Sequence, residues 1–163
     1  MRAIDEILSD NAAYASTFDK GDLPIPPGKG LAVIACMDAR VDPARLLGLG
    51  DGDAHVIRNA GGVVSDDVIR SLVISQRLLE TREIAVIHHT DCGMLSFRDD
   101  DVKDQILADT GLRPPFALEA FGDLEQDVRQ SVRRIEASPF IVHKDAVRGF
   151  IYDVDTGKLS AVD

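Results

Sequence analysis

Apolar and polar positions along the chain follow two patterns, one typical of buried strands and the other of amphipathic helices. Short apolar runs of strand length occur at residues 31–36, 55–60 and 83–89. Apolar positions recur at roughly helical spacing in the segments between and around these runs, which are residues 3–18, 44–50, 65–79, 99–111 and 121–138. The final segment, 147–162, reads as two short strands joined by a turn.

Capping residues mark where several of these helices begin and end. Asp42 followed by Pro43 is typical of a helix start, and Ser65 precedes two further acidic residues in the first turn of the next helix. Gly111 marks the end of the segment that begins with three aspartates at 99–101, which we interpret as a solvated helix start.

The alternation of strands and helices predicts an α/β fold. We expect a mainly parallel central sheet with helices on both faces, because parallel strands need crossover connections, and an antiparallel edge strand from the C-terminal hairpin. The length of 163 residues is typical of a single domain. In such sheets, ligands bind beyond the carboxyl ends of strands where the strand order reverses.

Composition narrows the classes of partner. The formal net charge is -10 with a pI near 4.7, which argues against a nucleic-acid partner, since phosphate binding needs clustered basic residues. No apolar run approaches the ~20 residues of a membrane span, and the first residues lack the basic region and apolar core of a secretory signal. We therefore expect a cytoplasmic protein without a membrane partner.

The residues that could bind a metal or take part in catalysis follow two of the predicted strands. Cys36, Asp38 and Arg40 follow the first strand in CMDAR, and His89 and Cys92 follow the third in HHTDCGM. The two cysteines, 56 residues apart, are compatible with a disulfide, small core residues, catalysis or a metal site. Together with His89 they form a Cys2His set suited to zinc with one coordination position left open.

The spacing of these motifs resembles that of the β-class carbonic anhydrases. That family has Cys-x-Asp-x-Arg followed some fifty residues later by His-x-x-Cys, which here are residues 36–40 and 89–92. VIRNAGG at 56–62 and FIYDVDTGKL at 150–159 are also similar to the family. The sequence departs from the family where Met94 follows Cys92-Gly93, since a second glycine is frequent there, and no glutamine or large aromatic set marks the substrate pocket.

The resemblance implies a Zn2+ ion held by Cys36, His89 and Cys92, and hydroxide at the fourth position that converts carbon dioxide to bicarbonate. In this interpretation Asp38 accepts a hydrogen bond from the hydroxide, and Arg40 pairs with Asp38 to keep it off the metal. Asp38 is also close enough to become a fourth metal ligand if that pair breaks, as in some relatives. A plain surface salt bridge is the alternative role for the pair.

Several roles stay open at this stage. His88 should face away from His89, but one sequence does not exclude that the two exchange roles. His55 and His143 are either polar fillers or a proton shuttle. Gly61 and Gly62 either form a tight turn or let the backbone approach substrate or a partner chain.

Assembly and activity also have alternatives. Residues 1–30, a helix and the Pro/Gly-rich arm GDLPIPPGKG, are expected to pack on a partner subunit, and the resemblance implies a homodimer with active sites at its interface. The competing functions are a carbon disulfide or carbonyl sulfide hydrolase on the same fold, and a zinc-stabilised binding or regulatory protein without catalysis.

Overall fold

The computed structural model describes residues 2–163 and is built around one five-stranded sheet. The strands are β1 (Leu31–Cys36), β2 (Ala54–Asn59), β3 (Glu83–His89), β4 (Val147–Tyr152) and β5 (Leu159–Val162). Their order across the sheet is β2-β1-β3-β4-β5, and every neighbouring pair is parallel except the antiparallel β4-β5 pair at the edge. The predicted α/β fold with its antiparallel C-terminal edge is confirmed.

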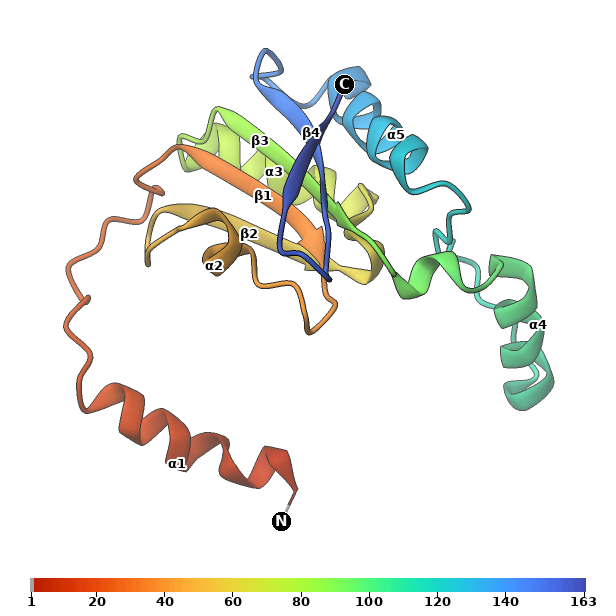
Figure 1. The fold of residues 1–163 in the computed structure, drawn as a ribbon, viewed down its shortest axis with the longest axis horizontal. Helices are drawn as coiled ribbons and strands as arrows, with labels where there is room; N and C mark the ends of the chain where they lie inside the picture. The colour runs from red at the N-terminus through yellow and green to blue at the C-terminus, as the bar shows by residue number, and fades with distance from the viewer. Residues whose placement is uncertain (1) are drawn as a thin grey trace.

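Helices lie on both faces of the sheet, as expected, but unequally (Figure 1). They are α1 (Ala3–Ala15), α2 (Pro43–Leu47), α3 (Asp66–Leu78), α4 (Asp99–Thr110) and α5 (Leu124–Ala137), with short 3-10 turns at Ala60–Gly62 and Gly93–Leu95. α3 and α5 cover one face, and the short α2 covers part of the other.

The central strand β1 shows why its sequence is apolar throughout. Ala32 and Ile34 face the core beneath α3 and α5, while Val33 and Ala35 face the α2 side. Successive side chains of a strand point to opposite faces, so a strand covered on both sides has no solvent-facing position left for a polar residue. All four side chains are fully buried.

The predicted caps are present. The Asp42 carboxylate accepts a hydrogen bond from the backbone N–H of Arg45, and the Ser65 hydroxyl accepts one from the N–H of Val68. Gly111 ends α4 in the left-handed conformation, which glycine adopts without steric cost. Local chemistry therefore sets these helix boundaries.

Two details differ from the sequence expectation. β2 runs one residue earlier than predicted, from 54 to 59, because the residues after Asn59 turn into a 3-10 segment. The aspartates at the start of α4 are not all solvated. The Asp99 carboxylate accepts hydrogen bonds from three backbone N–H groups, those of Leu118, Glu119 and Ala120.

The first helix lies apart from the sheet at the end of an extended arm (Figure 1). None of the residues of α1 is buried, although several are large and apolar, including Ile4, Ile7, Leu8 and Tyr14. Among the described residues, no helix is both long and apolar enough to cross a membrane.

Candidate metal centre

The strand order creates the site. The chain passes from β1 to β2 on one side and then returns to place β3 on the other side of β1, so the strand order reverses between β1 and β3. Loops leaving the carboxyl ends of these two strands diverge there and leave room for a ligand. Cys36 is the last residue of β1, and His89 is the last residue of β3.

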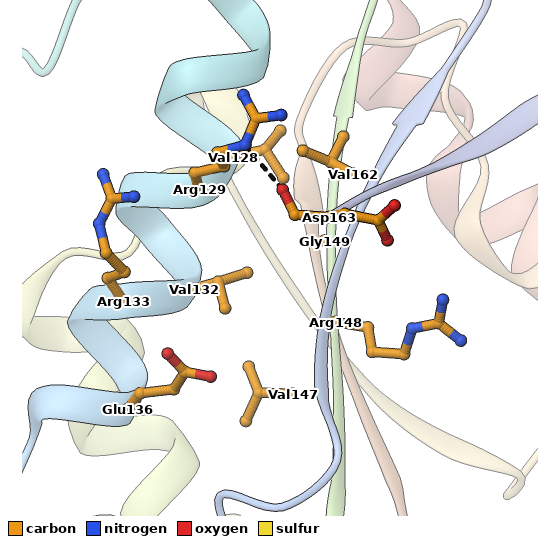
Figure 2. A pocket seen from close by; sticks show the side chains of 10 residues that line it. All are labelled: Val128, Arg129, Val132, Arg133, Glu136, Val147, Arg148, Gly149, Val162 and Asp163. Atoms are coloured by element: carbon orange, nitrogen blue, oxygen red, sulfur yellow. Dashed lines mark hydrogen bonds between the residues drawn. The ribbon is translucent and has the colours of Figure 1, made fainter.

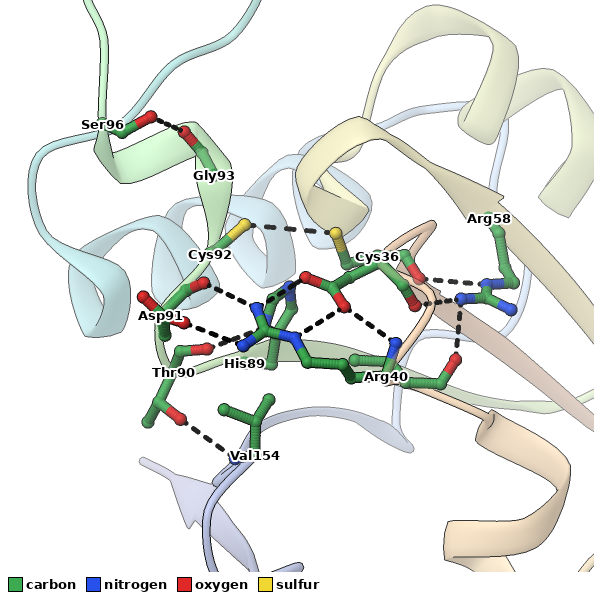
Figure 3. Close-up of polar contacts among 12 residues, drawn as sticks. Cys36, Arg40, Arg58, His89, Thr90, Asp91, Cys92, Gly93, Ser96 and Val154 are labelled. Carbon is green, nitrogen blue, oxygen red and sulfur yellow. Dashed lines mark hydrogen bonds and ion pairs between the residues drawn. The ribbon is translucent and has the colours of Figure 1, made fainter.

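Cys36, His89 and Cys92 come together at this point. One ligand atom from each lies within 4.8 Å of the others, and the two sulfur atoms are 4.0 Å apart. All three residues are buried (Figure 3). Two ligands on a tetrahedral zinc ion, with Zn–S bonds of about 2.3 Å, would be separated by about 3.8 Å, so the group is close to metal-binding geometry without rearrangement.

The hydrogen bonds of His89 leave the correct nitrogen free for a metal. Its Nδ1–H donates to the carbonyl oxygen of Thr90 at 2.8 Å, which places the lone pair on Nε2. Nε2 is buried and has no hydrogen-bond partner among the described residues. A buried, unpartnered acceptor facing two thiols is what a metal ion would satisfy, so these residues fit the ion that the sequence implies.

The local electrostatics favour a thiolate at Cys36. A hydrogen bond with the Cys92 thiol lowers the pKa of Cys36, and the backbone N–H groups of Asp38 and Gly61 also point at this sulfur. The pKa of Cys92 is raised by the same contact with Cys36 and by burial, so one thiol of the pair keeps its proton until a cation is bound. Burial lowers the pKa of His89, but the nearby Cys36 sulfur and the Thr90 carbonyl oxygen outweigh burial, and the net shift is upward.

Asp38 and Arg40 form a tightly bonded pair beside this group. The Asp38 carboxylate accepts bonds from the Arg40 backbone N–H at 2.9 Å, from Nε at 3.0 Å and from Nη2 at 2.8 Å. These contacts hold the pKa of Asp38 well below its usual range, so the carboxylate stays charged. Its Oδ2 is 3.8 Å from His89 Nε2, so the structure has the arrangement in which Asp38 pairs with Arg40 next to the candidate ligands.

Arg40 has a second acidic partner. Its Nη1 donates to the Asp91 carboxylate at 2.8 Å, and Nη2 donates to the Asp91 carbonyl oxygen at 3.0 Å. Asp91 lies between the candidate ligands His89 and Cys92, so Arg40 connects the loop after β1 to the loop after β3 (Figure 3). The exposed surface pair considered from the sequence is therefore part of a wider network.

A cavity of about 320 Å³ opens next to the sulfur atoms. It is lined mainly by apolar groups, which are Met37, Ala60, Gly61, Gly93, Met94 and Phe97 in addition to Cys36, Asp38 and Cys92. Phe121 packs against the same cluster from a distant part of the chain. Phe97 and Phe121 form an aromatic wall beside the sulfur atoms that was not predicted from the sequence.

The two glycines after β2 form a tight turn against β1 and beneath the cavity. A Cβ on Gly62, whose φ is +67°, would lie 2.9 Å from the backbone nitrogen of Cys36. A Cβ on Gly61 would lie 2.9 Å from Met94 Cγ. In this chain the close approach is therefore to its own backbone and to the cavity wall.

The other histidines lie elsewhere. The His88 imidazole points away from the candidate ligands, as the alternation of strand side chains predicts, and its Nε2 is 2.7 Å from the Asp127 carboxylate of α5. His55 pairs in register with Ala32 near the start of β1, at the opposite end of the strand from Cys36. The backbone of His143 contacts Gln76 before β4 begins. Their positions give neither His55 nor His143 access to the cavity.

One residue of the site was missed altogether. Arg58 on β2 donates to three carbonyl oxygens of the segment that carries Asp38, which are those of Cys36, Asp38 and Val41 (Figure 3). The only sequence signal was an arginine near the carboxyl end of a strand beside the strand of Cys36.

A second cavity, of about 360 Å³, lies between α5 and the β4-β5 edge (Figure 2). Arg129, Arg133 and Arg148 line it, but their guanidinium groups point in different directions. Arg129 is already bonded to the Asp163 carbonyl oxygen at 2.7 Å. The polar groups do not converge on one point, so this cavity lacks the arrangement of a built site.

A mainly parallel sheet with a buried Cys-His-Cys group where the strand order reverses is typical of a metal-binding enzyme, and comparisons with known proteins show which family the chain belongs to. The sequence pattern of the carbonic anhydrase family matches residues 31–114. The chain is 59% identical to beta-carbonic anhydrase 1 of Mycobacterium tuberculosis over 99% of both chains. It also superposes on the crystal structure of carbonic anhydrase from Streptococcus mutans with a TM-score of 0.94 and 41% identity, covering 100% of this chain and 99% of that one.

The chain belongs to the β-carbonic anhydrase family. A more distant match is the carbon disulfide hydrolase of Acidithiobacillus thiooxidans, with 36% identity over 94% of this chain and 87% of the relative. The same fold therefore occurs in proteins named for two different substrates.

Proposed function

We propose that this chain catalyses the reversible hydration of carbon dioxide to bicarbonate and a proton, with Zn2+ held by Cys36, His89 and Cys92. The observation that carries the proposal is the buried Cys-His-Cys group, with its free His89 Nε2, beside the bonded Asp38–Arg40 pair. A bound zinc ion would supply the Lewis acidity that makes water nucleophilic near neutral pH.

The residues around that position supply orientation. Asp38 stays ionised because Arg40 occupies it, so it is a permanent hydrogen-bond acceptor for the attacking water. An acceptor on one side of the water directs a lone pair to the other side, toward the carbon atom of carbon dioxide. Arg40 holds the carboxylate in that role through its bidentate contact, and we assign Asp38 and Arg40 to the catalytic machinery.

The cavity fits the substrate's chemistry. Carbon dioxide is small, linear and uncharged, and the wall of the cavity is largely apolar next to the sulfur atoms. Bicarbonate is charged and gains nothing from such a wall, so the lining favours release of the hydrated product. The carboxylate of Asp38 adds repulsion to a bound anion.

The apolar lining also makes carbon disulfide or carbonyl sulfide hydrolysis the second candidate function, in line with the more distant relative. A binding or regulatory protein without catalysis is disfavoured, because a purely structural zinc site has no use for a charged acceptor held next to it.

Stopped-flow measurement of carbon dioxide hydration by the zinc-loaded protein tests these alternatives. We expect the hydration rate to increase in proportion to zinc occupancy, with carbon disulfide turnover much slower in the same preparation. Metal-free protein, prepared by chelation and then reloaded with zinc, is the matched control. Faster turnover of carbon disulfide would favour the second candidate, and full zinc occupancy without turnover of either substrate would favour the binding protein.

We further propose that residues 1–163 form a single zinc-binding domain and that the functional unit is a homodimer. In this dimer, residues 1–30 of each chain pack on the partner subunit. α1 presents apolar residues that its own chain leaves exposed, with Leu8 82% and Ile4 69% exposed. The arm holds α1 away from its own sheet, in reach of a neighbour (Figure 1). Both site cysteines are free thiols, in keeping with a cytoplasmic location.

A further inference from the structure

The segment that carries Asp38 has little regular structure to hold it. After Cys36 the chain leaves the sheet, and its last ladder contact is the Met37 N–H donating to the Asn59 carbonyl oxygen at 2.8 Å. The chain then turns, with the Val41 N–H donating to the Asp38 carbonyl oxygen at 3.0 Å. Met37, which precedes this turn, is 64% exposed, and Ala39 and Arg40 within the turn are exposed as well, so packing alone does not fix the segment.

One side chain from the neighbouring strand holds this turn. Arg58 Nε donates to the Cys36 carbonyl oxygen at 3.0 Å, and its Nη2 donates to the carbonyl oxygens of Asp38 at 2.8 Å and Val41 at 2.7 Å. These carbonyl groups stand at the beginning, middle and end of the segment 36–41. A single guanidinium group therefore fixes the path of the main chain at three points (Figure 3).

Arg58 is used only for this purpose among the described residues. It forms no ion pair within residues 2–163, although the chain carries an excess of acidic residues. Its planar, always charged head offers several donors in a fixed geometry, which suits three carbonyl groups better than the compact ammonium group of lysine.

The two arginines of the site contact different groups of Asp38. Arg40 bonds to the Asp38 carboxylate, whereas Arg58 bonds to the Asp38 main-chain carbonyl. A carboxylate is placed accurately only if its own backbone is also fixed, because a displacement of about 1 Å near the reacting atoms can cost about 100-fold in rate. Arg40 belongs to the same segment and bonds it to Asp91 in the loop after β3, whereas Arg58 bonds the main chain of the segment to strand β2 of the sheet.

We propose that Arg58 is a positioning residue for the proposed hydration reaction: by bonding to the carbonyl oxygens of Cys36, Asp38 and Val41, it holds the Asp38 carboxylate beside the metal-ligand group. Arg58 acts through Asp38 and does not itself contact substrate. This inference rests on the proposed function, and it assigns a role to a residue outside the Cys-x-Asp-x-Arg and His-x-x-Cys motifs.

Arg58→Met and Arg58→Lys test the role, with Arg77→Met as the matched control. Arg77 also donates to a main-chain carbonyl oxygen, that of Phe140, but it does so at the end of α3. Each full-length protein is studied as purified, with its zinc content and thermal unfolding measured first. We expect Arg58→Met to lower kcat by about 10- to 100-fold with little change in KM, Arg58→Lys to lose less, and the control to match the parent.

Two further readouts separate positioning from a merely structural role. Amide hydrogen exchange of residues 37–41 should become faster in Arg58→Met and stay unchanged in Arg77→Met. In a chain that already carries Asp38→Ala, adding Arg58→Met should lower the remaining activity by less than twofold, because its effect acts through the carboxylate that has been removed.

Two results would overturn the inference. One is unchanged exchange of residues 37–41 in both Arg58 variants, which shows that the arginine does not hold the segment. The other is an equal fold loss of activity with and without Asp38, which shows that its effect does not pass through Asp38. The exchange measurement does not depend on carbonic anhydrase activity, so a failure of the proposed function and a failure of this assignment are distinguishable.

Discussion

At the scale of single residues, the chemistry of the site depends on which atoms remain free after internal hydrogen bonds are made. His89 uses Nδ1 on the Thr90 carbonyl and keeps Nε2 available. Asp38 has both oxygens bonded to Arg40 and is thereby held next to the candidate ligands without joining them. Both side chains could bind a metal, but their hydrogen bonds give His89 the role of candidate ligand and Asp38 the role of orienting residue.

The ligand assignment predicts a specific loss of metal. Cys36→Ser, His89→Ala and Cys92→Ser should each weaken zinc binding by more than about 100-fold, since removing a ligand costs more than removing the group that orients it. Competition with a chelator of known affinity measures this for each variant. His88→Ala is the matched control and should bind zinc as the parent does, because His88 contacts Asp127. Full zinc affinity in a ligand variant would remove that residue from the set.

The orienting pair should behave differently. Asp38→Ala and Arg40→Met should keep one zinc ion per chain and lose about 10- to 100-fold or more in hydration rate, because the attacking water loses its fixed acceptor. Metal analysis combined with stopped-flow kinetics makes the comparison. Arg70→Met, which breaks an exposed pair with Asp67 on α3, should leave the rate unchanged. Near-normal rates in both site variants would remove the support for the orienting role.

The pH dependence follows from the low pKa of Asp38. Arg40 keeps this carboxylate charged, so its charge contributes stability above the ordinary carboxyl range, near pH 4, and that contribution is lost only as the pH falls through the lowered value. Titration of Asp38 therefore does not shape activity between pH 6 and about 9. We expect activity to be low near neutrality and to rise in mildly alkaline buffer, because ionised water competes better than neutral water with Asp38 for the metal.

A hydration pH profile paired with zinc-edge X-ray absorption checks this expectation. The structure has the Asp38–Arg40 pair formed, which is the arrangement that we expect to predominate in alkaline buffer. A metal shell and an activity that are both constant across the range would show that Asp38 does not exchange onto the metal.

Sequence reasoning predicted the cluster of candidate ligands but not the residue that holds the neighbouring segment. The proximity of Cys36, His89 and Cys92 was predictable because parallel strands place their carboxyl ends at one edge, so two motifs at strand ends must meet. Arg58 was not predictable in the same way. Its three acceptors are main-chain carbonyl groups, which every residue carries, and the sequence therefore contains no sign of where they converge.

At the scale of elements, the turn after β2 is a close contact between backbones. Gly62 in this turn lies against the end of β1, and its φ of +67° is costly for any other residue. The Cys36 sulfur and the cavity depend on this contact, because the same turn aims the Gly61 N–H at that sulfur.

Gly62→Ala should lower the free energy of unfolding by about 2–4 kcal/mol, from the strained φ and the contact of the new Cβ with Cys36 N. Urea unfolding measures the change. Gly122→Ala is the control, since a Cβ there meets nothing within 4 Å. Equal stability of the two variants would mean that the turn is free to relax away from β1.

Element prediction was most reliable where short-range chemistry decides. Ser65 caps the start of α3 and Gly111 ends α4, as expected, because each cap depends only on residues next to it in the sequence. The aromatic wall was missed for the opposite reason. Phe121 returns to the cavity after the α4 segment, and no local pattern states where that segment comes back.

At the scale of the whole molecule, α1 predicts the state of assembly. We expect a dimer by light scattering at micromolar concentration, and we expect Leu8→Asp to shift it toward monomer, because a charge would replace an apolar side chain in the proposed contact. Ser9→Asp adds the same charge to the opposite side of the helix and should leave the dimer intact. A parent protein that is monomeric at micromolar concentration would contradict the proposed assembly.

The segment between Met94 and Phe121, which contains α4, is suited to accept inserted residues. The Asp99 carboxylate accepts hydrogen bonds from the N–H groups of residues 118–120, and the Phe121 N–H donates to the Met94 carbonyl oxygen. The two ends of this segment are therefore held together. Loop-closure entropy grows only with the logarithm of length, so doubling a loop costs about 0.6 kcal/mol. Residues inserted near exposed Leu112 would lengthen a loop whose ends are already pinned. The loop around Leu112 is therefore a suitable place to insert a reporter or affinity tag without disturbing the cavity.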